Sequence, residues 1–133
     1  MSSPEQRAPT LDELDGFARE SFASLPPEFR SLCGELVFMV QDFPDEDVVQ
    51  AMELESPFDI LGLFQGADLA AREGGHHAPE PTMIFLYRRP ILDYWAEHDE
   101  ALGDIVRHVL IHEIGHHFGL SDEDMEAIEA SVE

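Results

Sequence analysis

Polar and apolar positions follow helical spacing near the start of the chain, where one helix is expected. Thr10 and Glu13 form a capping box, in which each side chain bonds to the backbone N–H of the other residue. Pro26-Pro27 should end the helix, because proline lacks the N–H that a helix interior uses. The apolar residues expected on its inward face are Leu11, Leu14, Ala18, Phe22 and Leu25.

Three short apolar runs in the middle of the chain predict strands, over residues 36–40, 60–65 and 83–88. The first run is continuously apolar and suits a strand covered on both faces, although a buried helix segment gives the same pattern. Asp45 is expected to cap a short helix between the first two runs. The glycine- and proline-containing residues 66–81 separate the last two, and a loop of this length in a small domain is usually functional or mobile.

Helical patterns return after the third run. Pro90 fits the first turn of a brief helix. Asp99 is expected to cap a long helix over residues 100–118, which is apolar nearly all round and therefore buried. Ser121 and Asp124 form a second capping box that opens a last helix. The residues expected to face inward on that last helix are Met125, Ile128 and Val132.

Strands that alternate with helices predict a mixed α/β layer, and 133 residues suit a single domain. The polar residues 1–9, with two prolines, predict a disordered tail, which leaves residues 10–133 as the domain. Cys33 is the only cysteine, so a reducing compartment is the simple interpretation. Because the start lacks the apolar core of a signal peptide and no run approaches membrane-spanning length, we expect a cytoplasmic protein.

The composition is strongly acidic, with 29 acidic residues, seven arginines, no lysine and a formal net charge of −22. Nucleic-acid binding needs clustered basic side chains, and anionic membrane surfaces need them as well, so both partners are disfavoured. An acidic surface favours cations and basic partners. A saline habitat or mimicry of a nucleic acid would give the same charge, and composition does not choose between these explanations.

The clearest chemical signal is the sequence His112-Glu113-Ile114-Gly115-His116. Two histidines four residues apart on a helix lie about 40° apart around its axis, so both rings can reach one ion. Glu113 follows the first histidine directly and can take a proton from a water at that ion, as a general base. By chance the bare pattern arises in about one such chain in twenty, so the residues that follow it matter.

Gly119 and Asp122 extend this pattern at fixed offsets. Gly119 can adopt a left-handed conformation and end the helix, after which the chain can bring Asp122 to the same ion. Two histidines and one carboxylate, with a fourth position open for water, are what a catalytic zinc site requires. In the competing interpretation, Asp122 occupies the first turn of the last helix, where the dipole stabilises a negative charge.

Four other histidines have simpler interpretations. His117 points about 140° away from His112 around the helix axis, so packing or hydrogen bonding is expected. His108 lies one turn before His112, where a place beside the ligands is favoured over ligation itself. His76 and His77 stand in the glycine-containing loop, where adjacent histidines are usually exposed to solvent.

The extended motif resembles the H-E-x-x-H-x-x-G-x-x-H/D form of the zincin metallopeptidases. More broadly, the chain is similar to the minimal zincin-like metallopeptidases of bacteria over nearly its whole length after the first ten residues. The segments that carry this similarity are Leu25-Pro26-Pro27-Glu28-Phe29, Asp42-Phe43-Pro44-Asp45, Leu61-Gly62-Leu63-Phe64, Phe85-Leu86-Tyr87-Arg88 and Val109 to Met125. The resemblance implies an α+β fold, in which a small mixed sheet of three or four strands packs against the motif helix and flanking helices. It also implies a zinc site, but it implies no particular substrate. Metzincins have a third histidine where this chain has Asp122.

Three hypotheses follow. In the first, Zn2+ is held by His112, His116 and Asp122, and Glu113 serves peptide-bond hydrolysis of a peptide or protein substrate. In the second, the same site binds metal without turnover and the acidic surface recruits a basic partner. In the third, the chain is an interaction protein and the motif is incidental. A monomer is the default expectation for all three.

Overall fold

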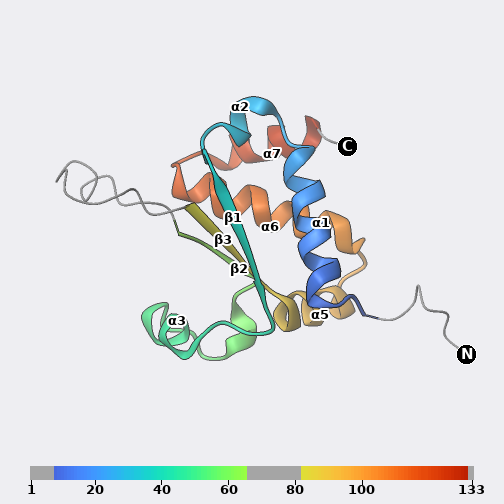
Figure 1. Cartoon of the computed structure of the whole chain (residues 1–133), viewed down its shortest axis with the longest axis vertical. Coiled ribbons are helices and arrows are strands. Elements are labelled where there is room, and N and C mark those ends of the chain that lie inside the picture. Colours follow the sequence, from blue (N-terminus) through green and yellow to red (C-terminus); the bar gives the residue numbers. More distant parts are fainter. Residues whose placement is uncertain (1–7, 66–81, 132–133) are drawn as a thin grey trace, which may run out of the picture.

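The computed structural model describes residues 8–65 and 82–131 (Figure 1). Helices and strands alternate along the chain, so the predicted mixed α/β layer is confirmed. In chain order the elements are α1 (Leu11–Ala23), α2 (Pro27–Arg30), β1 (Leu36–Gln41), α3 (Glu46–Ala51), the 3-10 helix η2 (Pro57–Asp59), β2 (Gly62–Gln65), β3 (Thr82–Tyr87), α5 (Arg88–Glu97), α6 (Leu102–His117) and α7 (Asp122–Ser131).

The three predicted strands form one mixed sheet in the order β1-β3-β2. β1 runs parallel to β3, with Leu36 opposite Thr82, and β2 runs antiparallel to β3, with Gly62 opposite Leu86. Among the described strands, β3 is therefore central, and it pairs with β1 on one side and β2 on the other. Arg88 does not extend β3 as predicted, because α5 begins at that residue.

α6 lies at the centre of the fold and crosses behind β1 in the view of Figure 1. Alternate residues of β3 are buried, as expected for a sheet with one face against helices. α1 contacts both α6 and β1, and α7 packs along α6. The fully buried side chains of this core include Leu14, Ile84, Leu86, Ile91, Val106, Leu110, Ile111, Ile114 and Met125.

Two glycines permit close approaches to α6. A Cβ atom at Gly62 would lie 2.7 Å from Val109 Cγ1 and 2.9 Å from the backbone oxygen of Phe85. A Cβ atom at Gly115 would lie 2.5 Å from Met125 Sδ. The sheet and α7 therefore both reach α6 at points where a larger residue would push them away, and this fixes the surroundings of the motif helix.

Both predicted capping boxes are confirmed. Thr10 Oγ1 accepts from Glu13 N at 3.1 Å, and a Glu13 side-chain oxygen accepts from Thr10 N at 3.1 Å. At the start of α7, Ser121 Oγ accepts from Asp124 N at 3.1 Å, and the Asp124 carboxylate accepts from Ser121 N at 3.3 Å. Gly119 has φ +75°, so the predicted left-handed residue after α6 is confirmed as well.

Asp99 does not cap α6, and this prediction is wrong. The cap position belongs to Ala101, whose backbone oxygen accepts from Asp104 N and Ile105 N at 3.1 Å each. The reason is the connection after α5, where residues 98–100 turn the chain before α6 begins. Asp45 does occupy the cap position of α3, but its side chain makes no capping hydrogen bond.

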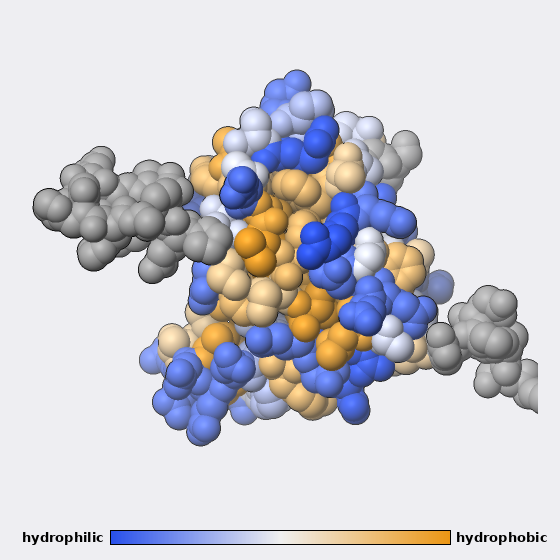
Figure 2. Space-filling model, in the orientation of Figure 1, coloured by the Kyte–Doolittle hydropathy of each residue, from blue (hydrophilic) through white to orange (hydrophobic). Residues whose placement is uncertain are grey.

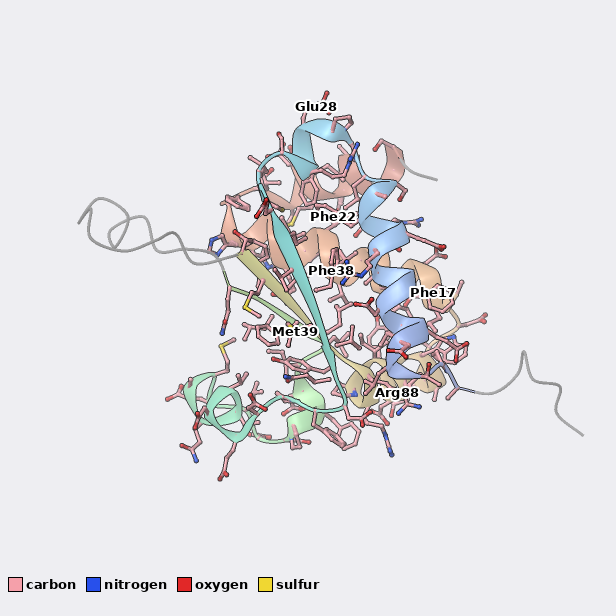
Figure 3. All side chains as sticks on the ribbon, in the orientation of Figure 1. Phe17, Phe22, Glu28, Phe38, Met39 and Arg88 are labelled. Atoms are coloured by element: carbon pink, nitrogen blue, oxygen red, sulfur yellow. The ribbon has the colours of Figure 1, made fainter. Side chains whose placement is uncertain are left out.

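Aromatic and basic side chains connect α1 to the sheet (Figure 3). The rings of Phe22 and Phe38 meet edge to face with centroids 5.8 Å apart, and the Arg19 guanidinium lies 5.0 Å from the Phe38 centroid. Arg88 Nε donates to the backbone oxygen of Pro9 at 2.7 Å, which holds the buried Pro9 against the start of α5. Such contacts keep α1 in place along β1.

Figure 2 shows apolar residues gathered over β1 and beside α1, surrounded by hydrophilic ones. Val37 and Met39 of β1 are among the exposed apolar side chains of the described residues. No helix in the described part of the chain is long and apolar enough to cross a membrane. The predicted tail up to residue 7, the loop 66–81 with its two histidines, and Val132 lie outside the described residues.

Candidate metal centre

α6 presents a row of imidazoles along one face. His108, His112 and His116 follow one another at intervals of four residues, so they lie one above the other. The ring centroids of His108 and His112 are 3.9 Å apart, and those of His112 and His116 are 5.7 Å apart. His112 is half-buried, with 25% of its side chain exposed, whereas His108 and His116 are exposed. The middle histidine of the row is therefore the one most enclosed by protein.

Glu113 lies beside this row and is half-buried. Burial raises the pKa of its carboxyl group, and the positive charge of a protonated His116 opposes that shift. A carboxylate with a raised pKa is a better proton acceptor, and this suits a general base. Burial, together with the charges of Asp45 and Glu113, raises the pKa of Tyr87 to about 12, so its buried phenol stays neutral.

His117 is separate from the row, as predicted from its direction. Its ring lies against Phe64 of β2 with centroids 4.5 Å apart and meets Phe118 edge to face at 5.0 Å. The predicted packing role is confirmed. His117 thereby helps to hold β2 against the end of α6.

The structure adds a carboxylate that the sequence interpretation missed. Glu129 of α7 points to the histidine row, with Oε1 2.7 Å from His108 Nδ1 and 3.2 Å from His112 Nε2. The oxygen is buried between the two imidazoles in ion-pair contacts, and it makes no regular hydrogen bond among the described residues. A sequence signal did exist, because Glu129 follows the inward-facing Met125 by four residues and so lies on the face of α7 that meets α6.

Asp122 lies elsewhere on α7. It is the first residue of that helix and is exposed. Among residues 8–65 and 82–131, the group of metal-binding side chains gathered within 4.8 Å of one another consists of His108, His112 and Glu129. The structure thus brings His112 to Glu129, while Asp122 and His116 stand outside that group.

The electrostatics of His112 suit a metal ligand. Burial lowers its pKa most, and the charges of protonated His108 and His116 lower it further, whereas Glu129 opposes these effects. The imidazole is therefore kept neutral, and the neutral form is the one that binds metal. Imidazole nitrogens with a buried carboxylate oxygen between them match the donors that zinc takes, so the residues present fit the ion.

Comparison with known protein families assigns the chain to a family. Residues 33–132 match the family model described as zincin-like metallopeptidase. The chain belongs to this family. The match covers the sheet, the motif helix and α7, so the predicted α+β zincin-like fold is confirmed. A search of curated proteins finds no match to the chain.

Proposed function

We propose that this zincin-like protein hydrolyses peptide bonds with zinc. His112 and His116 hold the ion from successive turns of α6, and one carboxylate of α7 completes the set. The motif spacing assigns that place to Asp122, and the close approach to His112 Nε2 makes Glu129 its rival. When bound, zinc supplies Lewis-acid polarisation of the scissile carbonyl and lowers the pKa of the attacking water.

The observation that carries the proposal is the placement of Glu113. Its carboxylate is half-buried on the motif helix next to the first histidine, and burial raises its pKa. Glu113 accepts the proton of the attacking water and passes it to the leaving amine.

The test is the Glu113→Gln variant, which removes the base and keeps a side chain of the same shape. Zinc content should be unchanged, and the rate of peptide hydrolysis should fall at least about a hundredfold, the usual contribution of a general base. Mass spectrometry of a digested peptide library measures the rate, and elemental analysis measures the metal. Glu126→Gln, at an exposed position of α7, is the matched control and should cleave as the wild type does.

The rival function is a metal-binding module without turnover, in which the acidic surface recruits a basic partner. The net charge of −22 favours it. Zinc in both proteins, with no product from either the wild type or Glu113→Gln, would support the module. Equal cleavage by both would show that Glu113 is not the base.

A further inference from the structure

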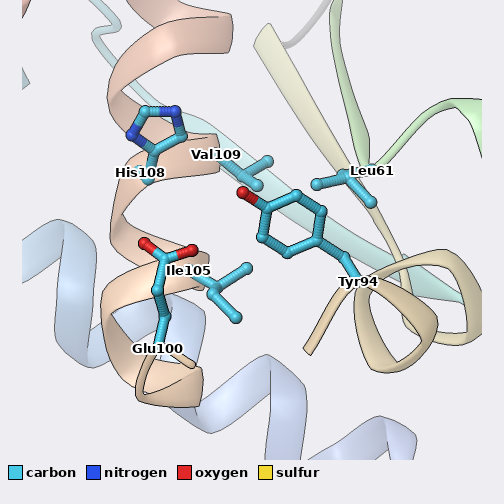
Figure 4. A pocket seen from close by; sticks show the side chains of 6 residues that line it. All are labelled: Leu61, Tyr94, Glu100, Ile105, His108 and Val109. Atoms are coloured by element: carbon cyan, nitrogen blue, oxygen red, sulfur yellow. The ribbon is translucent and has the colours of Figure 1, made fainter. Parts of the chain in front are cut away.

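A small pocket opens beside the histidine row, at its N-terminal end (Figure 4). It holds about 150 Å³, which is below the about 300–1,000 Å³ usual for drug-sized ligands, so it suits a single side chain. Its walls come from α5, α6, the connection between these helices, and the residue before β2. The residues that line it are Leu61, Tyr94, Glu100, Ile105, His108 and Val109.

The pocket has apolar walls and a polar end, where the exposed Glu100 carboxylate lies. Leu61, Ile105 and Val109 supply the walls, and in Figure 4 Tyr94 and Glu100 direct their oxygens to the side where His108 lies. Burial and the negative charge of Glu100 raise the pKa of the Tyr94 hydroxyl, so this hydroxyl stays protonated and can donate a hydrogen bond at the polar end. This polar end can therefore accept hydrogen bonds and carries a negative charge.

The polar end is held in place. The Tyr94 ring stacks on the His98 ring, with centroids 3.7 Å apart and planes 12° apart. His98 Nδ1 in turn lies 2.7 Å from the backbone oxygen of Tyr94. The one arginine of α6, Arg107, pairs with Asp104 at 3.0 Å, so its charge is already engaged.

The pocket adjoins the candidate metal centre through His108. That residue lines the pocket, and its ring centroid lies 3.9 Å from that of His112. A peptide lying across the row of histidines would thus place a side chain near its reacting bond at the mouth of this pocket.

We propose that this pocket, the Tyr94–Glu100 pocket, binds the lysine or arginine side chain of a substrate residue close to the scissile bond. This proposal rests on the proposed function. The aliphatic stem of the basic residue packs along the apolar walls, and its cationic head reaches the carboxylate of Glu100 and the hydroxyl of Tyr94. An acidic side chain is repelled by Glu100, and an apolar one leaves that carboxylate without a cationic partner.

The overall charge supports this choice. With 29 acidic residues against seven arginines, the protein attracts positively charged peptides before any contact forms. This long-range attraction acts on any basic peptide and weakens as the salt concentration rises. A preference set by Glu100, in contrast, applies to one residue position of the substrate.

The first test measures binding without turnover. N-acetyl-arginine, N-acetyl-lysine and N-acetyl-norleucine methylamides are titrated into the zinc-loaded Glu113→Gln protein, followed by NMR of the Tyr94 and His108 rings. The two basic probes should bind at least about tenfold tighter than norleucine, which is about 1.4 kcal/mol. In the same background, adding Glu100→Gln should remove that preference, and adding Glu97→Gln, an exposed acid at the end of α5, should keep it.

The second test uses cleavage by the wild type. For peptides that differ at one position near the scissile bond, kcat/KM should favour the basic residue about tenfold, and Glu100→Arg should reverse this preference toward glutamate. Equal binding of all three probes, or a preference that survives Glu100→Gln, overturns the pocket. Selective binding with no cleavage of any peptide leaves the pocket standing and overturns the proposed function. Cleavage of peptides without any preference for a basic residue leaves the proposed function standing and overturns the pocket.

Discussion

The two carboxylates of α7 that compete for the place of third metal ligand differ in how the fold holds them. Asp122 is the first residue of the helix and is exposed, next to the turn that Gly119 makes. Glu129 lies two turns further along, with a buried oxygen 3.2 Å from His112 Nε2. The position of Asp122 is set by its fixed separation from His116 along the chain. The position of Glu129 is set by the packing of α7 on α6.

The sequence alone therefore predicts one of these two positions and not the other. An offset such as that from His116 to Asp122 is visible in the sequence, whereas the approach of Glu129 exists only once α7 lies along α6. The Gly115–Met125 contact produces that packing, because a Cβ atom at Gly115 would lie 2.5 Å from Met125 Sδ. Both acids can be negative beside a zinc ion, so variants must decide which one binds it.

The strongest test compares Asp122→Asn with Glu129→Gln by zinc titration against a competing chelator. Removal of the true carboxylate ligand should weaken zinc at least about tenfold, or about 1.4 kcal/mol, because it takes an anionic donor from a dication. The other variant should stay within about threefold of the wild type. If the weakened variant is Glu129→Gln, the packing interpretation is correct.

His112→Ala sets the scale of that experiment. Loss of this histidine should cost more than the about 10–100-fold typical for residues that only support a ligand. Unchanged affinity in both carboxylate variants would place the third donor on another residue, and His108 would be the next to replace.

Gly115→Val tests the packing itself. Its branched side chain would collide with Met125, and overfilling of this kind costs about 1–3 kcal/mol of unfolding free energy. Denaturant unfolding of the metal-free protein measures the loss. If Glu129 is the ligand, zinc affinity should fall as well, since α7 is displaced from the histidine row.

Gly103→Ala is the matched control on the same helix. No atom lies within 4 Å of a Cβ placed there, so alanine should raise stability by up to about 1 kcal/mol through its better helix propensity. A loss of stability in this control would mean that α6 is intolerant of substitution in general, and the Gly115 result would then say nothing about α7.

The smallest effect concerns pH. His112 has a folded-state pKa below its ordinary value of 6.5, so the unfolded state binds its proton more readily. In the metal-free protein, neutral His112 should contribute fully to the free energy of unfolding above pH 6.5. This contribution should be lost as the pH falls through the folded-state pKa. Because Glu129 opposes this lowering, Glu129→Gln should steepen the loss of Tm on acidification, and Asp122→Asn should not. Thermal melts in chelator between about pH 7.5 and 5 measure it, with His112→Gln as the variant that flattens the curve.

Local signals account for what could be predicted from the sequence. A capping box such as Thr10 with Glu13 depends on residues three apart, and the left-handed Gly119 depends on its own backbone. The motif histidines and Glu113 follow from spacing on one helix. These features need no knowledge of how distant segments meet.

The features that could not be predicted arise where elements meet. Asp99 has the right chemistry for a cap, but the turn at residues 98–100 moves the start of α6 past it. Glu129 and the Tyr94–Glu100 pocket need the relative placement of three helices. The spacing of residues within one segment does not determine how the three helices are placed relative to one another.

The strand order also constrains how the chain can be made. Within residues 8–65 and 82–131, β1 and β2 each pair with β3 alone, which follows both in the chain, so these pairings cannot form until residues 82–87 have left the ribosome. Pairing between segments so distant along the chain is slow, and exposed strand edges invite association with other chains. Synthesis rate through the segment before β3 should therefore influence how much of this protein reaches its native state.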